Sequence, residues 1–186
     1  MVREAVLRAT LTELVESGYA GLSFDRVATR AGVHRTTVYR RWGNREDLVA
    51  DALLTQAAQD VLIPDTGSLN GDLSLLLGAI VANLTSPLGG GLVRALVSEA
   101  AQSPGIAVAG RKFWSTRFSG VAVVLRRAAE RGELPDGVDT DLFIEALVAP
   151  VFFRLLVTGQ PVPQDYVQRL IHWVISATAN TNITPA

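Results

Sequence analysis

The stretch from Ser23 to Trp42 limits the possible folds of this chain more than any other part of its sequence. It contains two short segments, each with one apolar face, and Gly32 lies between them. Ser23 is a good N-cap for the first segment, and a glycine can adopt the positive φ that a tight turn between helices needs. The inward apolar face consists of Phe24, Val27, Ala28, Val33 and Val38. This length and spacing predict a helix-turn-helix.

When those apolar residues face inward, the second helix presents a polar face to the solvent. That face consists of His34, Arg35, Thr36, Thr37, Tyr39 and Arg40. Arginine can bond a guanine base bidentately, threonine can contact a thymine methyl group or a phosphate, and tyrosine can bond a phosphate. Ser23 and the backbone amides that follow it can hold a further phosphate. The pattern predicts that the second helix enters the major groove of double-stranded DNA.

The distribution of charge agrees with a DNA contact. The whole chain has 17 basic and 18 acidic residues and a net charge of −1. Residues 26–45 nevertheless contain six arginines and no acidic residue. A local positive stripe on an otherwise acidic protein indicates a polyanion bound at that end. A solvated helix face is the alternative explanation of such a stripe, and the turn between the two helices favours DNA.

Helical periodicity continues along the rest of the chain without a convincing alternation of strand residues, so the predicted fold is all-α with about nine helices. They are expected at 2–16, 23–31, 35–41, 44–62, 70–85, 91–102, 105–131, 139–158 and 163–180. Gly18 is a plausible left-handed end of the first helix. The glycine-rich run from Pro87 to Gly91 is expected to be a flexible connection.

The linker at 64–67 is the best internal boundary because it contains a proline and a glycine. We therefore expect a three-helix DNA-binding domain with the helix-turn-helix at 1–45, a connecting helix at 46–63 and a larger helical domain at 64–186. The mean hydropathy of +0.27 suggests that a partner subunit covers part of the apolar surface.

The last two predicted helices favour a homodimer. Residues 142–157 are apolar around the whole circumference except chiefly at Glu145 and Arg154, and such a helix must be covered on all sides. A two-fold partner that completes a four-helix bundle would cover it, and an ordinary core helix is the alternative. Pro150 should kink this helix. The expected interface consists of Phe143, Leu147, Arg154, Tyr166, Leu170, Trp173 and Val174.

Aromatic residues of the larger domain predict a ligand pocket. The candidate lining residues are Phe113, Trp114, Arg117, Phe118, Phe152 and Phe153. Aromatic rings around one or two polar groups suit a small, mostly apolar molecule. The same residues could equally form a solid core, which would make the protein a constitutive DNA binder without an effector.

An enzyme is the main alternative class, and the sequence argues against it. The two histidines, His34 and His172, lie in different predicted domains, and no histidine or carboxylate group has the spacing of a metal site. We expect no catalytic residue, metal or cofactor. The absence of cysteine excludes disulfides and favours a reducing cytoplasm, and no apolar run reaches the ~18 residues of a membrane span. We expect a cytoplasmic protein without a membrane partner.

Residues 3–54 resemble the TetR/AcrR family of transcriptional regulators. The resemblance rests on Phe24, Val27-Ala28, Ala31-Gly32-Val33, the run Thr37 to Trp42 and the run Asn44 to Leu48. The segments 126–134 and 152–159 are also similar to C-terminal domains often found in that family. The resemblance implies a dimeric regulator, commonly a repressor, which binds a palindromic operator and is released by a small effector.

The resemblance also implies roles for single residues. It implies base or phosphate contact by Arg35, Thr36, Thr37, Tyr39 and Arg40, and phosphate contact by Ser23 and Arg45. His34 stands where a serine or threonine often caps the recognition helix, so we expect a specificity residue there rather than a cap. Trp42 replaces the usual phenylalanine and is expected only to pack.

Overall fold

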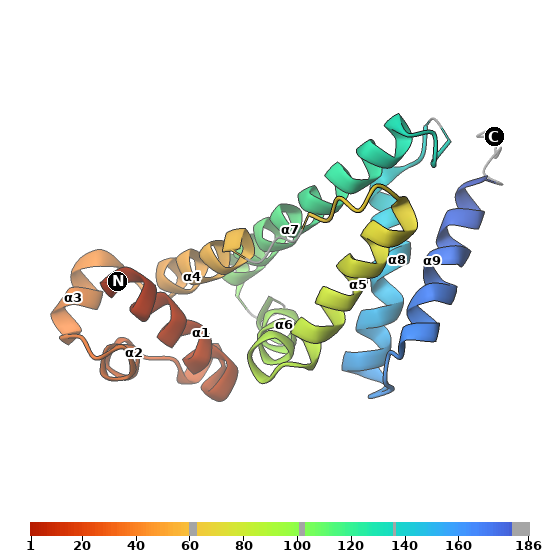
Figure 1. Cartoon of the computed structure of the whole chain (residues 1–186). Coiled ribbons are helices and arrows are strands. Elements are labelled where there is room, and N and C mark those ends of the chain that lie inside the picture. Colours follow the sequence, from red (N-terminus) through yellow and green to blue (C-terminus); the bar gives the residue numbers. More distant parts are fainter. Residues whose placement is uncertain (60–62, 101–102, 136, 180–186) are drawn as a thin grey trace. The chain divides into compact units, whose positions relative to one another are not determined.

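The computed structural model describes residues 1–59, 63–100, 103–135 and 137–179, and all regular structure within them is helical, as predicted (Figure 1). The helices are α1 Val2–Gly21, α2 Phe24–Ala31, α3 Arg35–Arg41, α4 Arg45–Gln59, α5 Leu69–Thr85, α6 Pro87–Ala100, α7 Pro104–Glu130, α8 Thr140–Phe152 and α9 Gln164–Ala179. A π-helical turn, η1 Phe153–Val157, directly follows α8. None of the described helices is by itself long and apolar enough to cross a membrane; α5 and α6 would suffice only as a pair with a break between them.

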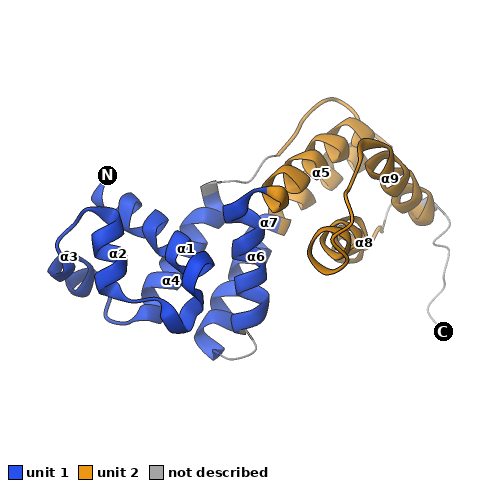
Figure 2. Cartoon of the chain, turned by 90° about the horizontal axis from the view of Figure 1, so that it is seen from below, with its two compact units in different colours: residues 1–61, 86–117 blue, residues 62–85, 118–186 orange. Residues whose placement is uncertain are grey.

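The chain divides into two compact units (Figure 2). Unit 1 comprises Met1–Val61 and Ser86–Arg117, and unit 2 comprises Leu62–Thr85 and Phe118–Ala186. The long helix α7 contributes its first part to unit 1 and its second part to unit 2. The two compact units therefore differ from the domains predicted from the linker at 64–67, because α6 and the start of α7 pack with the N-terminal helices.

Helix α1 is the central element of unit 1. It packs against α2, α4 and α6, and its buried side chains lie on more than one face. Leu7, Leu11 and Leu14 are each at most 3% exposed. The hydroxyl of Thr10, also buried, donates to the carbonyl of Val6 at 2.8 Å. The first helix was predicted to end at Gly18 in a left-handed conformation. Gly18 is instead an internal break in α1, with φ 65° and ψ 176°, and the helix continues to Gly21.

The glycine-rich run that the sequence analysis assigned to a flexible connection is helical instead, so that prediction is wrong. Pro87 is the first residue of α6, a favoured position for proline. Ser86 caps the helix, because its Oγ accepts a hydrogen bond from the backbone N of Gly89 at 3.0 Å. A Cβ on Gly91 would lie 2.4 Å from Cγ1 of Val15 in α1. The glycine thus permits α6 to approach α1 closely.

In unit 2, α5 packs against α8 and α9, and the buried carboxylate of Asp72 holds the start of α5. Its Oδ1 accepts hydrogen bonds from the N and Oγ1 of Thr66 at 2.6 and 2.8 Å, and its Oδ2 lies 3.3 Å from Arg131. Burial by itself would raise the pKa of Asp72, but the bonds from Thr66 and the charge of Arg131 together lower it. Arg131 also pairs with Glu133, which accepts a bond from the backbone N of Leu69 at 2.5 Å. These contacts join the linker before α5 to the turn after α7.

The predicted helix at 139–158 is present as α8 and η1. Asp139 caps α8, with its carboxylate accepting from the N of Leu142 at 3.0 Å. The helix continues through Pro150, and the wider turn η1 begins three residues later. Gly159, with φ 65°, follows the end of η1.

Replacing Gly91 by alanine should destabilise the protein, because the new Cβ would lie 2.4 Å from Cγ1 of Val15. Overpacking of this kind costs roughly 1–3 kcal/mol of unfolding free energy. The matched control is Gly78→Ala in α5, where a Cβ would meet no atom within 4 Å. Its greater helix propensity should stabilise the protein by about 0.5–1 kcal/mol. Urea unfolding at one fixed protein concentration measures both, and shifts of the same sign and size would refute the packing role of Gly91.

Candidate DNA-binding site

The helix-turn-helix is formed by α2, a turn at Gly32 and α3. Ser23 caps α2, with its Oγ accepting from the backbone N of Arg26 at 3.2 Å. Gly32 has φ 66° and ψ 32°, a left-handed conformation that favours glycine. The backbone N of Val33 donates to the carbonyl of Ala28 at 3.0 Å, which closes the end of α2. The turn chemistry expected from the sequence is therefore in place.

His34 caps α3, contrary to the expectation that it would not. Its Nδ1 accepts a hydrogen bond from the backbone N of Thr36 at 3.4 Å and lies 2.9 Å from Oγ1 of the same threonine. Nδ1 can cap a helix because it is bonded to Cγ, at the same position along the side chain as the Oδ1 acceptor of a capping asparagine. Histidine therefore supplies the acceptor that the family usually obtains from a hydroxyl group.

Buried residues at the end of α3 hold this helix on the core of unit 1, and one of them bonds to α4. Val38 is 0% and Trp42 5% exposed. The indole Nε1 of Trp42 donates to Oδ2 of Asp51 in α4 at 3.0 Å, and Arg3 of α1 pairs with the other carboxylate oxygen. Trp42 therefore does more than pack, which corrects the expectation from the sequence. A tryptophan side chain adds an indole donor that the usual phenylalanine lacks.

The outward face of α3 carries the residues that the sequence predicted for it. Arg35, Thr36, Tyr39 and Arg40 are exposed, and Thr37 is half-buried. Within the part of the chain that the structure describes, the guanidinium groups of Arg35 and Arg40 make no hydrogen bond or ion pair. The ring of Tyr39 contacts Phe24 of α2 edge-on at 4.7 Å between centroids. The face thus combines two uncompensated positive charges with hydroxyl groups.

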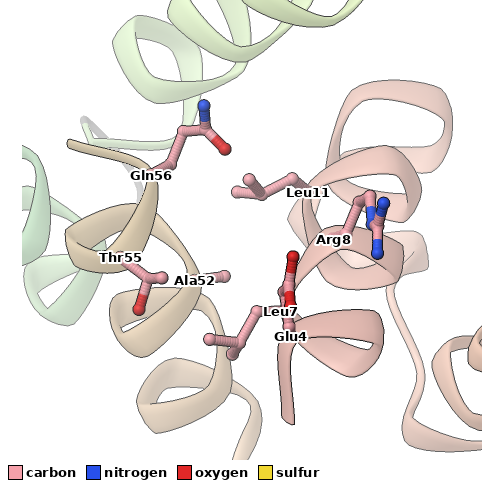
Figure 3. Close-up of a pocket in the computed structure, with 7 residues that line it drawn as sticks. All are labelled: Glu4, Leu7, Arg8, Leu11, Ala52, Thr55 and Gln56. Atoms are coloured by element: carbon pink, nitrogen blue, oxygen red, sulfur yellow. The ribbon is translucent and has the colours of Figure 1, made fainter. Parts of the chain in front are cut away.

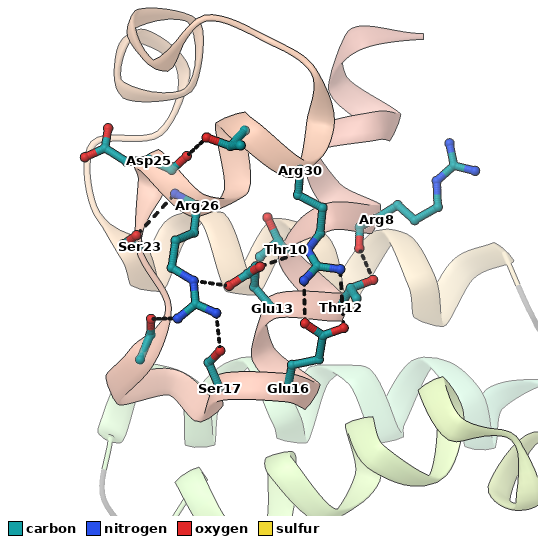
Figure 4. Close-up of polar contacts among 12 residues, drawn as sticks. Arg8, Thr10, Thr12, Glu13, Glu16, Ser17, Ser23, Asp25, Arg26 and Arg30 are labelled. Carbon is teal, nitrogen blue, oxygen red and sulfur yellow. Dashed lines mark hydrogen bonds and ion pairs between the residues drawn. The ribbon is translucent and has the colours of Figure 1, made fainter.

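Part of the predicted positive stripe is neutralised by α1 (Figure 4). Glu13, whose side chain is 3% exposed, has one carboxylate oxygen 2.9 Å from Nε of Arg26 and the other 2.8 Å from Nε of Arg30. Arg30 also pairs with Glu16. These ion pairs hold α2 on α1, so Arg26 and Arg30 are structural. Counting charges within residues 26–45 alone did not reveal this compensation, because Glu13 and Glu16 lie earlier in the chain.

Arg45, a predicted phosphate contact, also has partners within the protein. Its Nη1 donates to the carbonyls of Leu22 at 3.1 Å and Ala20 at 3.3 Å. Its guanidinium group lies 5.2 Å from the centroid of the Tyr19 ring. Arg45 therefore connects the start of α4 to the end of α1. A DNA phosphate bound by Arg45 would contact a guanidinium group that already bonds these carbonyls and lies against the Tyr19 ring.

Further contacts, which could not be predicted from the sequence, join α4 to α7 and α1 to α6 within unit 1. Oγ of Ser103, the N-cap of α7, donates to Glu46 in the first turn of α4 at 3.0 Å. The backbone N of Tyr19 donates to Glu99 of α6 at 3.4 Å. Burial, followed by the charge of Glu46, raises the pKa of Tyr19. Ser103 followed by proline is a capping signal that could have located the start of α7.

A shallow pocket of about 170 Å³ lies between α1 and α4 (Figure 3). Leu7, Leu11 and Ala52 form its apolar part. Its other lining residues are Glu4, Arg8, Thr55 and Gln56. None of them is a predicted ligand residue.

The predicted ligand residues are divided between the two units. In unit 1, Phe113 is 2% exposed and contacts Trp114 edge-on at 5.0 Å between centroids. The guanidinium group of Arg117 lies 5.2 Å from the centroid of the same Phe113 ring. In unit 2, Phe118 and Phe152 are partly buried, and Phe153 is exposed. The structure therefore brings Phe113, Trp114 and Arg117 together as one packed cluster.

The predicted interface residues include both core and surface positions of unit 2. Buried side chains are those of Phe143, Leu147, Leu170 and Val174. Arg154 lies 4.4 Å from the centroid of the half-buried Tyr166 ring. Trp173 is 64% exposed on α9. Three further apolar residues, Leu142, Phe153 and Val157, are exposed on α8 and η1.

Taken together, the turn geometry and the outward face of α3 define the class of this protein: it is a helix-turn-helix protein that binds DNA. Comparison with known proteins agrees. Residues 6–52 match the family described as "Bacterial regulatory proteins, tetR family", and residues 63–174 match "Tetracyclin repressor-like, C-terminal domain". The HTH-type transcriptional regulator AqdR of Rhodococcus erythropolis is 33% identical over 174 residues, which cover 94% of this chain and 84% of AqdR. The chain belongs to the TetR family of bacterial transcriptional regulators, which is not a class of enzymes.

Other relatives and solved structures agree. The DNA-binding transcriptional repressor TetR of Mycobacteroides abscessus is 31% identical over 175 residues, which cover 92% of this chain and 90% of that protein. The crystal structure of the TetR family transcription regulator SCO0332 superposes with a TM-score of 0.75 at 31% identity and covers 99% of both chains. The regulator FadR of Bacillus subtilis, solved in complex with stearoyl-CoA, has the same fold, with a TM-score of 0.74 at 16% identity and coverage of 93% and 97%.

Proposed function

We propose that this protein is a homodimeric repressor that binds a palindromic operator through α3 and acts in the cytoplasm. The observation that carries the proposal is the pair of exposed guanidinium groups, Arg35 and Arg40, on a recognition helix whose other face is buried. Repression, rather than activation, is supported by the relative in Mycobacteroides abscessus, which is a transcriptional repressor.

The proposed contacts follow from the chemistry of each group. Arg35 and Arg40 would bond base edges or phosphates, with Thr36, Thr37 and Tyr39 beside them. Ser23 and Arg45 would contact phosphates on either side. Arg26 and Arg30 are left out of this surface because Glu13 and Glu16 neutralise them.

Replacing both Arg35 and Arg40 by alanine should abolish most of the specific binding, because a good arginine–guanine contact contributes about 1–3 kcal/mol of discrimination. The matched control is Arg111→Ala, since Arg111 is an exposed arginine of α7 outside the helix-turn-helix. Fluorescence anisotropy would compare the three proteins on a duplex selected from genomic DNA. Equal affinity of the double variant and the wild type would refute the site.

The dimer is supported by the exposed apolar residues of unit 2. Leu142, Phe153, Val157 and Trp173 are each more than half exposed, and all lie on α8, η1 or α9. Exposed large apolar side chains gathered on a few elements indicate an interaction surface. A second copy that packs its own α8 and α9 there would complete a four-helix bundle and hold two recognition helices at a set spacing.

Light scattering without DNA should give the mass of a dimer for the wild type. Trp173→Glu should shift the protein toward the monomer, because a buried unpaired carboxylate at the interface is costly. Val97→Glu, at an equally exposed position of α6, should leave the dimer intact. A monomeric wild type, or equal dissociation of both variants, would contradict the proposed interface.

We further propose that a small, mostly apolar effector releases the operator. The solved structure of FadR with stearoyl-CoA shows that this fold accommodates a ligand with a long apolar chain in another protein. In this chain Phe113 and Trp114 place two aromatic rings beside the cation of Arg117. Because Phe113 is only 2% exposed, the effector would reach this cluster in a conformation that opens the packing around it. The effector can weaken DNA binding by no more than its differential affinity for the two conformations.

A panel of apolar compounds together with stearoyl-CoA, which carries a long apolar chain, tests this proposal, and coenzyme A is the control that lacks the apolar chain. At least one compound should raise the melting temperature of the protein and weaken its operator affinity by roughly 5- to 150-fold. Phe113→Ala should reduce that response. Operator affinity unchanged by every compound would instead favour a constitutive DNA-binding protein.

A further inference from the structure

His34 is the residue immediately before the recognition helix, and its ring is exposed. One ring nitrogen, Nδ1, contacts Thr36 twice: it lies 3.4 Å from the backbone N and 2.9 Å from Oγ1. The other, Nε2, makes no hydrogen bond within the part of the chain that the structure describes. The two nitrogens of one side chain therefore face different surroundings.

The contact with the backbone determines which nitrogen carries the proton. A backbone N–H can only donate, so Nδ1 must be the acceptor and cannot bear hydrogen. The hydroxyl of Thr36 can donate as well as accept, so in this tautomer it shares the single lone pair of Nδ1 with the backbone N–H. If Nδ1 carried the proton, only the hydroxyl contact would survive and α3 would lose its cap. The capped conformation therefore requires the tautomer of the neutral imidazole that carries its proton on Nε2.

We propose that His34 is a specificity-determining residue that presents Nε2–H to a hydrogen-bond acceptor on a base edge in the major groove. This inference rests on the proposed operator contact of α3. The acceptors available there are N7 and O6 of guanine, N7 of adenine and O4 of thymine. A base is favoured over a phosphate because residues at the start of a recognition helix contact base edges.

His34 would both cap α3 through Nδ1 and donate to a base through Nε2–H, which a smaller capping residue such as serine cannot do. Serine supplies an acceptor to the backbone N at the second residue after it, but its hydroxyl does not extend to where Nε2 lies. A serine variant would thus keep α3 capped and lose the outward donor. An alanine variant would lose both. The two substitutions separate capping from recognition.

The tautomer can be measured directly on the full-length protein. The chain has two histidines, so a His172→Gln variant assigns the signals of His34 without ambiguity. Long-range 15N–1H NMR correlation at about pH 8, where an ordinary histidine is neutral, should show Nε2 protonated and Nδ1 unprotonated. The Nδ1–H tautomer would overturn the inference.

Recognition is tested by selection from a library of random duplexes with the wild type, His34→Ser and His34→Ala. The serine variant should melt at the wild-type temperature but lose about 5- to 150-fold discrimination at one base pair of each half-site, while the other positions keep their preference. The alanine variant should show the same loss and also melt lower. A serine variant with the wild-type preference at every position, or with uniformly weaker binding to all duplexes as a phosphate contact would give, overturns the inference. If the wild type itself enriches no sequence, the proposed operator contact fails instead.

Discussion

A helix of seven residues is too short to be stable by itself in water, so α3 depends on the packing that surrounds it. Val38 and Trp42 hold it through buried surface, and Trp42 adds a hydrogen bond to Asp51 of α4. Helix α1 provides the centre on which α2, α4 and α6 pack. The position of the proposed DNA-binding surface consequently depends on the packing of unit 1.

Arginine has two different functions in this unit, and its neighbours decide which. Arg26 and Arg30 meet the buried carboxylate of Glu13, so their charge is compensated and they fix α2 on α1. Arg35 and Arg40 have no such neighbour among the residues that the structure describes, and their charge stays available for a polyanion. The distinction matters for DNA binding, because only uncompensated charges attract phosphates at a distance.

Local signals made much of the site predictable. Ser23, Gly32 and the apolar spacing between them located both helices of the helix-turn-helix to within one residue. The run after Pro87 was misassigned because consecutive glycines signal a turn as readily as a close helix contact. The contact of Gly91 with the side chain of Val15, which is remote in the sequence, shows that this run makes a close helix contact rather than a turn. The capping by His34 was missed for a related reason, since a ring nitrogen is a less common acceptor than a hydroxyl.

The sequence by itself determined the all-α fold, the helix-turn-helix and the residues on the outward face of α3. Periodicity, caps and turn glycines act over a few residues, so they can be recognised without knowing the fold. Only the tertiary structure decided which arginines are compensated, how Glu46 joins α4 to α7 and Glu99 joins α6 to α1, and which apolar residues of α8 and α9 stay exposed. Those properties depend on distances between residues that are remote in the chain, and helix packing alone fixes such distances.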